Sequence, residues 1–188
     1  MLQCTSATLR NSQVPSAAEQ VSAATVAADG AIPFNQFMQL ALYGDAGFYT
    51  TTGQAGRRGG DFITSPEVGP LFCTVIARAL DAWWIELGSL SRSDVVECGA
   101  GPGTLARSIM AAKPQCMDAL RYVAIEVSAA RRTLHPDNIE SRETLPDGPI
   151  TGVVLANQLL DNLPFRLFVF DGVWMVANNE HKETTERE

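Results

Sequence analysis

The chain has 188 residues, of which 46% are hydrophobic and 19% charged, and these proportions are ordinary for a globular protein. Its formal net charge of −7 argues against a nucleic-acid-binding protein or a membrane-surface protein, because either would present a basic face. No apolar run approaches the roughly 18 residues that a membrane-spanning helix needs, so we expect no membrane insertion.

The chain begins with residues that are rich in Ala, Ser and Thr, and this composition predicts a disordered tail over residues 1–30. Pro33 then opens a segment with apolar residues at spacings of three and four, which predicts a short helix ending near Gly44. We assign residues 31–90 to one N-terminal segment of helices and loops that caps a ligand site.

The most regular helix is predicted from Ser65 to about Gly88. Ser65 is a typical N-cap, Pro66 suits the first helical position, and Glu67 interacts favourably with the positive end of the helix. Residues 60–64 carry polar groups just before this N-terminus, where backbone amides point at ligands. We therefore expect the 60–67 loop to meet a ligand.

A glycine-rich turn follows the next predicted strand, as Glu97 and then Gly99, Gly101 and Gly103. Glycine has no Cβ, so alternating glycines allow a sharp turn and the close approach of a ligand, and the helix start behind them supplies amide donors. The dinucleotide fingerprint needs a third glycine where this chain has Thr104, and Glu97 would repel a pyrophosphate. A cofactor with an ammonium or sulfonium group tolerates that acid better, and S-adenosylmethionine (SAM) is such a cofactor.

A second acidic residue, Glu126, comes at the end of the apolar run at 122–127, 23 residues after Gly103. In nucleotide-binding folds, the acid that binds the ribose hydroxyls lies about 20 residues beyond the glycines. This spacing predicts a nucleotide site that includes Glu126. Taken alone, Glu126 would more often be a solvated residue at the end of a strand.

Further strands are predicted near 138–142 and at 151–156, with helical segments between the strands. This alternation predicts an α/β fold with a mostly parallel, doubly wound sheet over residues 91–164, whose ligands bind at the carboxyl ends of the strands. Residues 165–177 predict a β-hairpin, and residues 178–188 a second disordered tail.

The four cysteines contain no C-x-x-C pair, so the sequence predicts neither a zinc site nor a redox motif, and a reducing compartment fits them. The histidines His135 and His181 are isolated in the sequence, and we expect both to be exposed to solvent. No metal site is predicted.

Four sequence blocks follow one another in a specific order: G-D-F-I-T-S-P-E-V-G-P-L-F at 60–72, V-V-E-C-G-A-G-P-G-T-L-A at 95–106, Y-V-A-I-E-V-S at 122–128 and V-V-L-A-N-Q-L-L-D-N-L-P-F at 153–165. Together they resemble the MidA-type SAM-dependent methyltransferases. The resemblance extends from about residue 33 to residue 176. It implies a Rossmann-like class I methyltransferase core and a protein arginine acceptor, in a family whose mitochondrial members assist the assembly of a respiratory complex.

The resemblance also implies roles for residues of this chain. Glycines 99, 101 and 103 would line the methionine part of SAM, Glu97 would lie near its ammonium group, and Glu126 would bind the ribose. The loops at 60–67 and 157–161 would close over cofactor and substrate, with Thr64, Ser65 and Asn157 as further cofactor-binding residues. The expected location is the bacterial cytoplasm, with the mitochondrial matrix as the alternative.

The sequence departs from the family pattern in two ways. The fourth block usually reads A-N-E, whereas this chain has Gln158, which replaces a carboxylate with a neutral amide. Orienting a guanidinium group favours acidic side chains, so Asp161, and less strongly Glu67, are the candidate catalytic residues. The chain also stops after about four predicted parallel strands, so we expect a sheet that is incomplete on its C-terminal side.

Two alternatives to a methyltransferase remain. Gln158 and the short length favour a non-catalytic SAM-binding protein or assembly partner. The glycine turn and Glu126 also suit an NAD-dependent oxidoreductase, although Thr104 and Glu97 argue against one.

Overall fold

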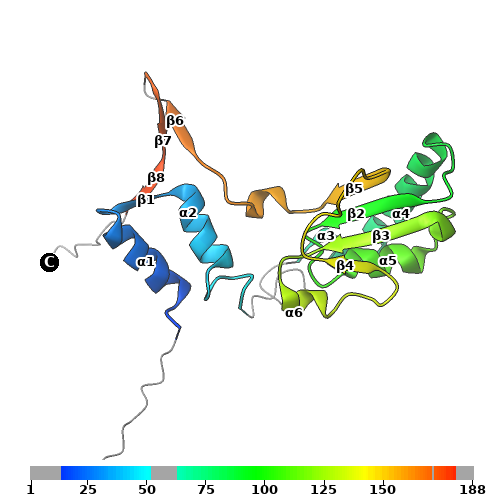
Figure 1. Cartoon of the computed structure of the whole chain (residues 1–188), viewed down its shortest axis with the longest axis horizontal. Helices are drawn as coiled ribbons and strands as arrows, with labels where there is room; N and C mark the ends of the chain where they lie inside the picture. Colours follow the sequence, from blue (N-terminus) through cyan, green and yellow to red (C-terminus); the bar gives the residue numbers. More distant parts are fainter. Residues whose placement is uncertain (1–13, 52–62, 171, 181–188) are drawn as a thin grey trace, which may run out of the picture. The chain divides into compact units, whose positions relative to one another are not determined.

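The computed structural model describes residues 14–51, 63–170 and 172–180. The chain divides into two compact units (Figure 1). The central unit is Thr52–Leu163, and the flanking unit combines Met1–Thr51 with Pro164–Glu188. The predicted 31–90 segment is therefore split, since residues 31–51 and residues 63–90 belong to different units.

The central unit is built on a four-stranded sheet in the order β4-β3-β2-β5, and every neighbouring pair is parallel. The strands are β2 (Ser93–Cys98), β3 (Leu120–Ile125), β4 (Glu140–Arg142) and β5 (Gly152–Ala156). This is the strand order with which doubly wound nucleotide-binding folds begin. The predicted α/β fold with a mostly parallel sheet is confirmed.

Helices α4 (Pro70–Glu86) and α5 (Thr104–Ala112) pack on one face of this sheet. Their buried side chains meet Val95 of β2 and Tyr122 of β3 in the larger hydrophobic core. On the other face, Val96 and Val123 belong to a smaller cluster. Both β2 and β3 are therefore buried on two faces, which explains why their sequences read as continuous apolar runs rather than as alternating patterns.

The helix predicted from Ser65 is interrupted. A short helix α3 (Ser65–Val68) ends at Gly69, and α4 begins at Pro70. Proline cannot donate a helical hydrogen bond and disfavours the helical conformation of the residue before it, so the helix restarts there. Thr64 rather than Ser65 is the N-cap residue of α3, and its side chain makes no capping hydrogen bond.

Three shorter helical elements complete the central unit: η2 (Met117–Ala119) before β3, α6 (Ala129–Arg132) after β3, and η3 (Leu160–Asn162) after β5. Residues 60–62 of the loop that we predicted to meet a ligand lie outside the described residues. None of the described helices has the length and apolar character that crossing a membrane requires.

The flanking unit contains a helix where the sequence predicted a disordered tail. Helix α1 (Ala17–Ala27) begins after Ser16, whose hydroxyl accepts a hydrogen bond from the amide of Glu19, while the Glu19 carboxylate accepts one from the amide of Ser16. This reciprocal capping box, together with the helix preference of alanine, stabilises α1. The disorder prediction is wrong for residues 17–27, because it considered the composition and not the cap.

The rest of the flanking unit comes from both ends of the chain. It contains β1 (Ala31–Pro33), α2 (Phe34–Met38), the π-helical turn η1 (Gln39–Tyr43), and the hairpin of β6 (Phe168–Phe170) and β7 (Trp174–Val176). The short helix ending near Gly44 and the β-hairpin occur as predicted. Strand β8 (Asn178–Glu180) pairs antiparallel with β1, so the tail predicted for 178–188 begins with a strand.

Candidate functional site

Three parallel strands of the central unit end at the same level. Cys98 of β2 lies opposite Ile125 of β3 and opposite Ala156 of β5. The residues that follow, Gly99, Glu126 and Asn157, therefore leave the sheet side by side at its carboxyl edge. Ligands of doubly wound folds bind at this edge, so the register brings together three of the residues that the sequence predicted to bind a cofactor.

The turn after β2 depends on its glycines. Gly99, Gly101 and Gly103 have φ angles of 73°, 55° and 79°, in the left-handed region that residues with a Cβ rarely adopt. The amides of Gly99 and Ala100 both donate to the carbonyl oxygen of Ile125, at 3.0 Å. We refer to residues 99–103 as the glycine turn.

The three glycines differ in the space around them. A Cβ on Gly99 would lie 2.9 Å from Cδ1 of Leu159, and a Cβ on Gly103 would lie 3.1 Å from Cδ2 of His135. A Cβ on Gly101 would meet no atom of the described residues within 4 Å. Gly99 and Gly103 are thus packed against protein, whereas the backbone of Gly101 is open to an approaching ligand.

Glu126 holds the glycine turn in place. Its side chain is buried, with 8% of the residue exposed. Oε2 accepts a hydrogen bond of 2.9 Å from the amide of Gly101, and Oε1 accepts one of 2.8 Å from the amide of Ser128. A carboxylate has about four lone-pair positions, so this arrangement leaves acceptor capacity for two further donors.

Glu97 lies inside the central unit, with 4% of the residue exposed. Its Oε2 accepts a hydrogen bond of 2.8 Å from the hydroxyl of Tyr122. Burial raises the pKa of Glu97 to about 7, and the nearby Glu126 raises it too, while the Tyr122 hydrogen bond and Arg107 act in the opposite direction. The carboxyl group of Glu97 therefore titrates well above the range of an ordinary glutamate.

Glu67 belongs to α3, and its side chain contacts the first residue of helix α5. The hydroxyl of Thr104 donates a hydrogen bond of 2.7 Å to its Oε1. Arg107 donates through Nη2 to the Thr104 hydroxyl and through Nη1 to the carbonyl oxygen of Pro102, at 3.3 and 2.8 Å. Glu67, predicted as a weaker catalytic candidate, is thereby linked to the glycine turn through Thr104.

The loop after β5 contains a second departure from regular backbone. Gln158 has a φ of 52°, which is strained for a residue with a Cβ and is a feature that clusters at functional sites. Asp161 is exposed, and Nδ2 of Asn162 donates to its Oδ1 at 3.4 Å. Leu159 reaches Gly99, so the loop touches the glycine turn.

Thr64, Ser65 and Asn157 are half-buried. Thr64 and Ser65 form the start of α3, and Asn157 follows β5 directly. The position of Asn157 agrees with the predicted edge of the sheet. The roles of all three residues toward a cofactor stay predictions.

Sequence reasoning missed two side chains that hydrogen-bond to the glycine turn, those of His135 and Arg107. His135, which we expected to be exposed, is half-buried, and its Nε2 lies 2.9 Å from the carbonyl oxygen of Gly101. Arg107 was not singled out, although it stands three residues after Thr104 and hence on the same side of a helix. For His135 the sequence carries no signal, because the contact joins residues that are 34 positions apart.

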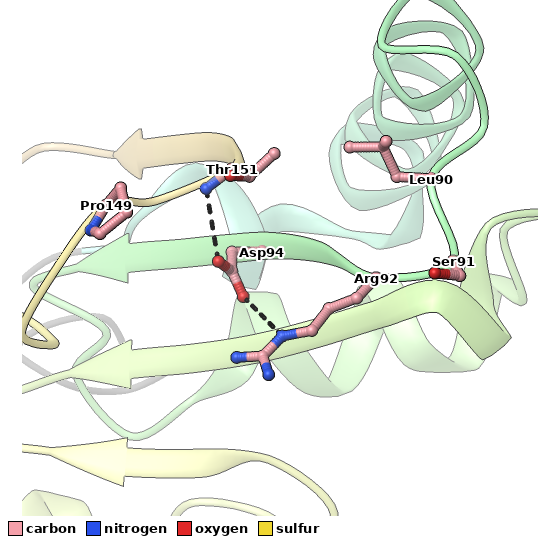
Figure 2. Close-up of a pocket in the computed structure, with 6 residues that line it drawn as sticks. All are labelled: Leu90, Ser91, Arg92, Asp94, Pro149 and Thr151. Carbon is pink, nitrogen blue, oxygen red and sulfur yellow. Dashed lines mark hydrogen bonds and ion pairs between the residues drawn. The ribbon is translucent and has the colours of Figure 1, made fainter.

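A pocket lies at the opposite end of the sheet, at the amino ends of β2 and β5. Figure 2 shows Asp94 between the amide of Thr151 and the guanidinium group of Arg92, at 3.4 and 3.5 Å. Arg121 also pairs with Asp94 and with Glu140 of β4. These charges tie neighbouring strands together, and the pocket lies away from the edge where doubly wound folds bind ligands.

Comparison with known proteins gives consistent matches. A family model of S-adenosyl-L-methionine-dependent methyltransferases, Methyltransf_28, matches residues 75–186. The chain is 39% identical over 88 residues to the mitochondrial protein arginine methyltransferase NDUFAF7 homolog of Drosophila melanogaster, covering 46% of this chain and 20% of that protein. It is 31% identical over 106 residues to the mitochondrial protein arginine methyltransferase NDUFAF7 of Danio rerio, covering 56% and 25%.

A solved structure also matches. A COG1565 superfamily member from Burkholderia thailandensis, bound to S-adenosyl-homocysteine, superposes with a TM-score of 0.66 at 28% identity, over 93% of this chain and 54% of that one. The chain thus spans about half of this solved chain, and its alignments span a fifth to a quarter of the two curated relatives. With a family model matched over more than half of its residues, the chain belongs to the Methyltransf_28 family of S-adenosyl-L-methionine-dependent methyltransferases, as its resemblance to MidA-type proteins predicted.

Proposed function

We propose that this chain binds SAM at the glycine turn and transfers its methyl group to an arginine side chain of a protein. The observation that supports this most directly is the open backbone of Gly101, held by Glu126 at the carboxyl edge of the sheet. When bound, SAM supplies an electrophilic methyl group on a sulfonium centre. The protein contributes binding and alignment, which account for much of the rate of a bimolecular transfer.

The residues of the site fit the cofactor chemically. Gly101 allows the close approach of the methionine part, with Gly99 and Gly103 shaping the turn on either side. The free lone pairs of Glu126 would accept hydrogen bonds from two ribose hydroxyls. An ionised Glu97 would favour the ammonium group electrostatically.

Asn157, Thr64 and Ser65 are the remaining cofactor-binding candidates. All three have polar side chains that are half-buried, which allows a polar contact without full desolvation. The amides at the start of α5 add donors, since its N-cap Gly103 provides no side-chain cap.

For the acceptor, we propose a protein arginine on the basis of the relatives named above. A guanidinium group stays positively charged at every physiological pH, so negatively charged side chains orient it best. Asp161 is exposed in the loop after β5 and is the candidate to do so. Glu67 already accepts a hydrogen bond from the Thr104 hydroxyl. We therefore propose that Glu67 mainly stabilises the glycine turn and has only a secondary catalytic role.

The biological setting is also proposed from the resemblance. The acceptor would be a subunit of a respiratory complex during its assembly. The bacterial origin of the matching solved structure supports a cytoplasmic location, and the mitochondrial relatives make the matrix the alternative.

A second candidate function is a non-catalytic SAM-binding or assembly partner. Gln158 favours it, because a neutral amide in a strained conformation stands where the family pattern has a carboxylate. The two functions differ in one measurable respect. Methyl transfer that occurs only after Gln158→Glu would identify the parent chain as a binding protein.

The test begins with calorimetric titration of SAM and S-adenosyl-homocysteine into the full chain, followed by transfer of radiolabelled methyl to candidate acceptor proteins. The Glu126→Gln variant should bind at least about tenfold more weakly, since one charged acceptor is lost. Asp118→Asn is the matched control, because it removes an exposed acid that precedes β3, at the amino edge of the sheet. A folded parent that binds neither compound would exclude the proposed function.

A further inference from the structure

His135 joins a distant segment to the glycine turn. Its Nε2 lies 2.9 Å from the carbonyl oxygen of Gly101, and its Nδ1 lies 2.8 Å from the hydroxyl of Ser141. A carbonyl oxygen can only accept, so Nε2 carries the proton in this contact. In the neutral ring, Nδ1 then accepts from the Ser141 hydroxyl, which fixes both the tautomer and the orientation of the imidazole.

This contact completes the restraint of Gly101. The amide of Gly101 donates to Glu126 at 2.9 Å, and its carbonyl oxygen accepts from His135. The two peptide planes on either side of Gly101 are therefore each held by one buried or half-buried side chain. A glycine without such restraint would sample many conformations, and ordering it on ligand binding would cost free energy.

The same imidazole also packs beside the third glycine. Cδ2 of His135 lies 3.1 Å from the position of a Cβ on Gly103, and Cδ of Pro136 lies 3.3 Å from it. Arg107 strengthens the connection, since its Nη1 donates both to Pro102 in the turn and to Leu134 next to His135. The segment 134–136 is thus fastened to the glycine turn at several points.

We propose that His135 is a positioning residue of the cofactor site, an inference that rests on the proposed function. Its Nε2–H fixes the carbonyl of Gly101, and its ring fills the space beside Gly103, so that the open side of Gly101 keeps one shape before the cofactor arrives. Preorganisation of this kind increases affinity because less conformational entropy is lost on binding.

The test compares three variants that differ in where they place a hydrogen-bond donor. His135→Gln puts an amide N–H near the position of Nε2, His135→Asn puts one near the position of Nδ1, and His135→Ala removes the donor. The control is Thr133→Ala, since the Thr133 hydroxyl bonds to the Ala130 carbonyl within its own segment.

The measurement is the dissociation constant of S-adenosyl-homocysteine by calorimetry, with circular dichroism and urea unfolding to monitor the fold. We expect His135→Ala and His135→Asn to weaken binding by about tenfold, as for the loss of one hydrogen bond. His135→Gln should recover most of the parent affinity, and Thr133→Ala should bind like the parent. Nitrogen-15 spectra of the parent should show the Nε2–H tautomer at His135.

The outcomes separate the two proposals. A parent that does not bind would exclude the cofactor site and the role of His135 with it. If the parent binds and the His135→Asn variant has the same dissociation constant as the parent, the positioning role alone is overturned. If His135→Ala does not fold, the Gln and Asn variants decide, because a merely structural role would not distinguish their donor positions.

Discussion

The hydroxyl of Tyr122 donates a 2.8 Å hydrogen bond to Oε2 of Glu97 inside the central unit. Burial raises the pKa of Glu97 to about 7, and burial also raises the pKa of Tyr122, so that Tyr122 is the donor at every physiological pH. If the proposed cofactor site includes Glu97, a carboxyl group that titrates near neutrality there couples cofactor binding to proton release.

The first prediction concerns the pH dependence of cofactor affinity. If Glu97 faces the ammonium group, its ionised form binds better, so affinity for S-adenosyl-homocysteine should rise by up to about tenfold between pH 6 and pH 8. Calorimetry in buffers of different ionisation enthalpy should detect proton release on binding at pH 6.5. Glu97→Gln should give weaker binding with a flat profile, and a flat profile for the parent would contradict the prediction.

The second prediction concerns stability. The pKa of Glu97 is about 7 in the folded state against 4.5 as its ordinary value, so the unfolded chain loses this proton first as pH rises. The contribution of Glu97 to the free energy of unfolding is fully present below pH 4.5 and is lost as pH rises through 7. Glu97→Gln should therefore be more stable than the parent at pH 8.5 by up to roughly 3 kcal/mol, and no more stable at pH 4. Urea unfolding at the two pH values measures this difference, and an equal difference at both would count against it.

The third prediction concerns Gly152, the first residue of β5. It has a φ of 150°, and a Cβ there would lie 2.7 Å from the backbone nitrogen of Asp94 in the paired strand β2. Gly152→Ala should destabilise the chain by about 3 kcal/mol or more, because backbone atoms cannot move aside. Gly148→Ala is the matched control, since a Cβ at Gly148 meets no atom of the described residues within 4 Å, and it should cost only about 1 kcal/mol. Equal thermal midpoints for the two variants would refute the steric argument.

The fourth prediction concerns cysteine reactivity. Oδ1 of the buried Asp81 accepts a 3.0 Å hydrogen bond from the amide of Cys116, and burial together with Asp81 raises the pKa of the Cys116 thiol to about 12. The thiolate is the reactive form, so Cys116 should resist iodoacetamide at pH 8 far longer than the half-buried Cys98. Mass spectrometry of timed samples measures both rates. Asp81→Ala should expose Cys116 and destabilise the chain by about 2 kcal/mol, and early modification of Cys116 in the parent would contradict this account.

Much of the central unit could be predicted because its signals are local. The run into Glu97, the alternate glycines and the apolar spacing of α4 each lie within a short window, and each produced the predicted element. The helix α1 was missed because its capping box consists of two residues within an Ala-rich stretch that also suits a disordered tail. After α3, Gly69 and Pro70 interrupt a spacing that on its own predicts one helix.

The contacts of the site could be predicted only in part. The spacing of Glu126 predicted its place at the edge of the sheet, but not that both of its oxygens accept backbone amides. That geometry depends on how the turn folds back over β3. The bond from His135 to Gly101 likewise depends on the path of the chain between α6 and β4, which no periodicity encodes.

The pairing of β1 with β8 has a consequence for the order of events during synthesis. Ile32 leaves the ribosome before the central unit, whereas its partner Asn179 follows the whole central unit. All four parallel strands are translated before β1 can pair with β8, so the central unit has the opportunity to fold first. Until β8 is made, residues 31–33 lack the strand partner that they have in the folded chain, and unpaired strand-forming segments are sites of aggregation. Slow translation of residues 164–180 would therefore prolong the period in which the nascent chain is open to misassembly.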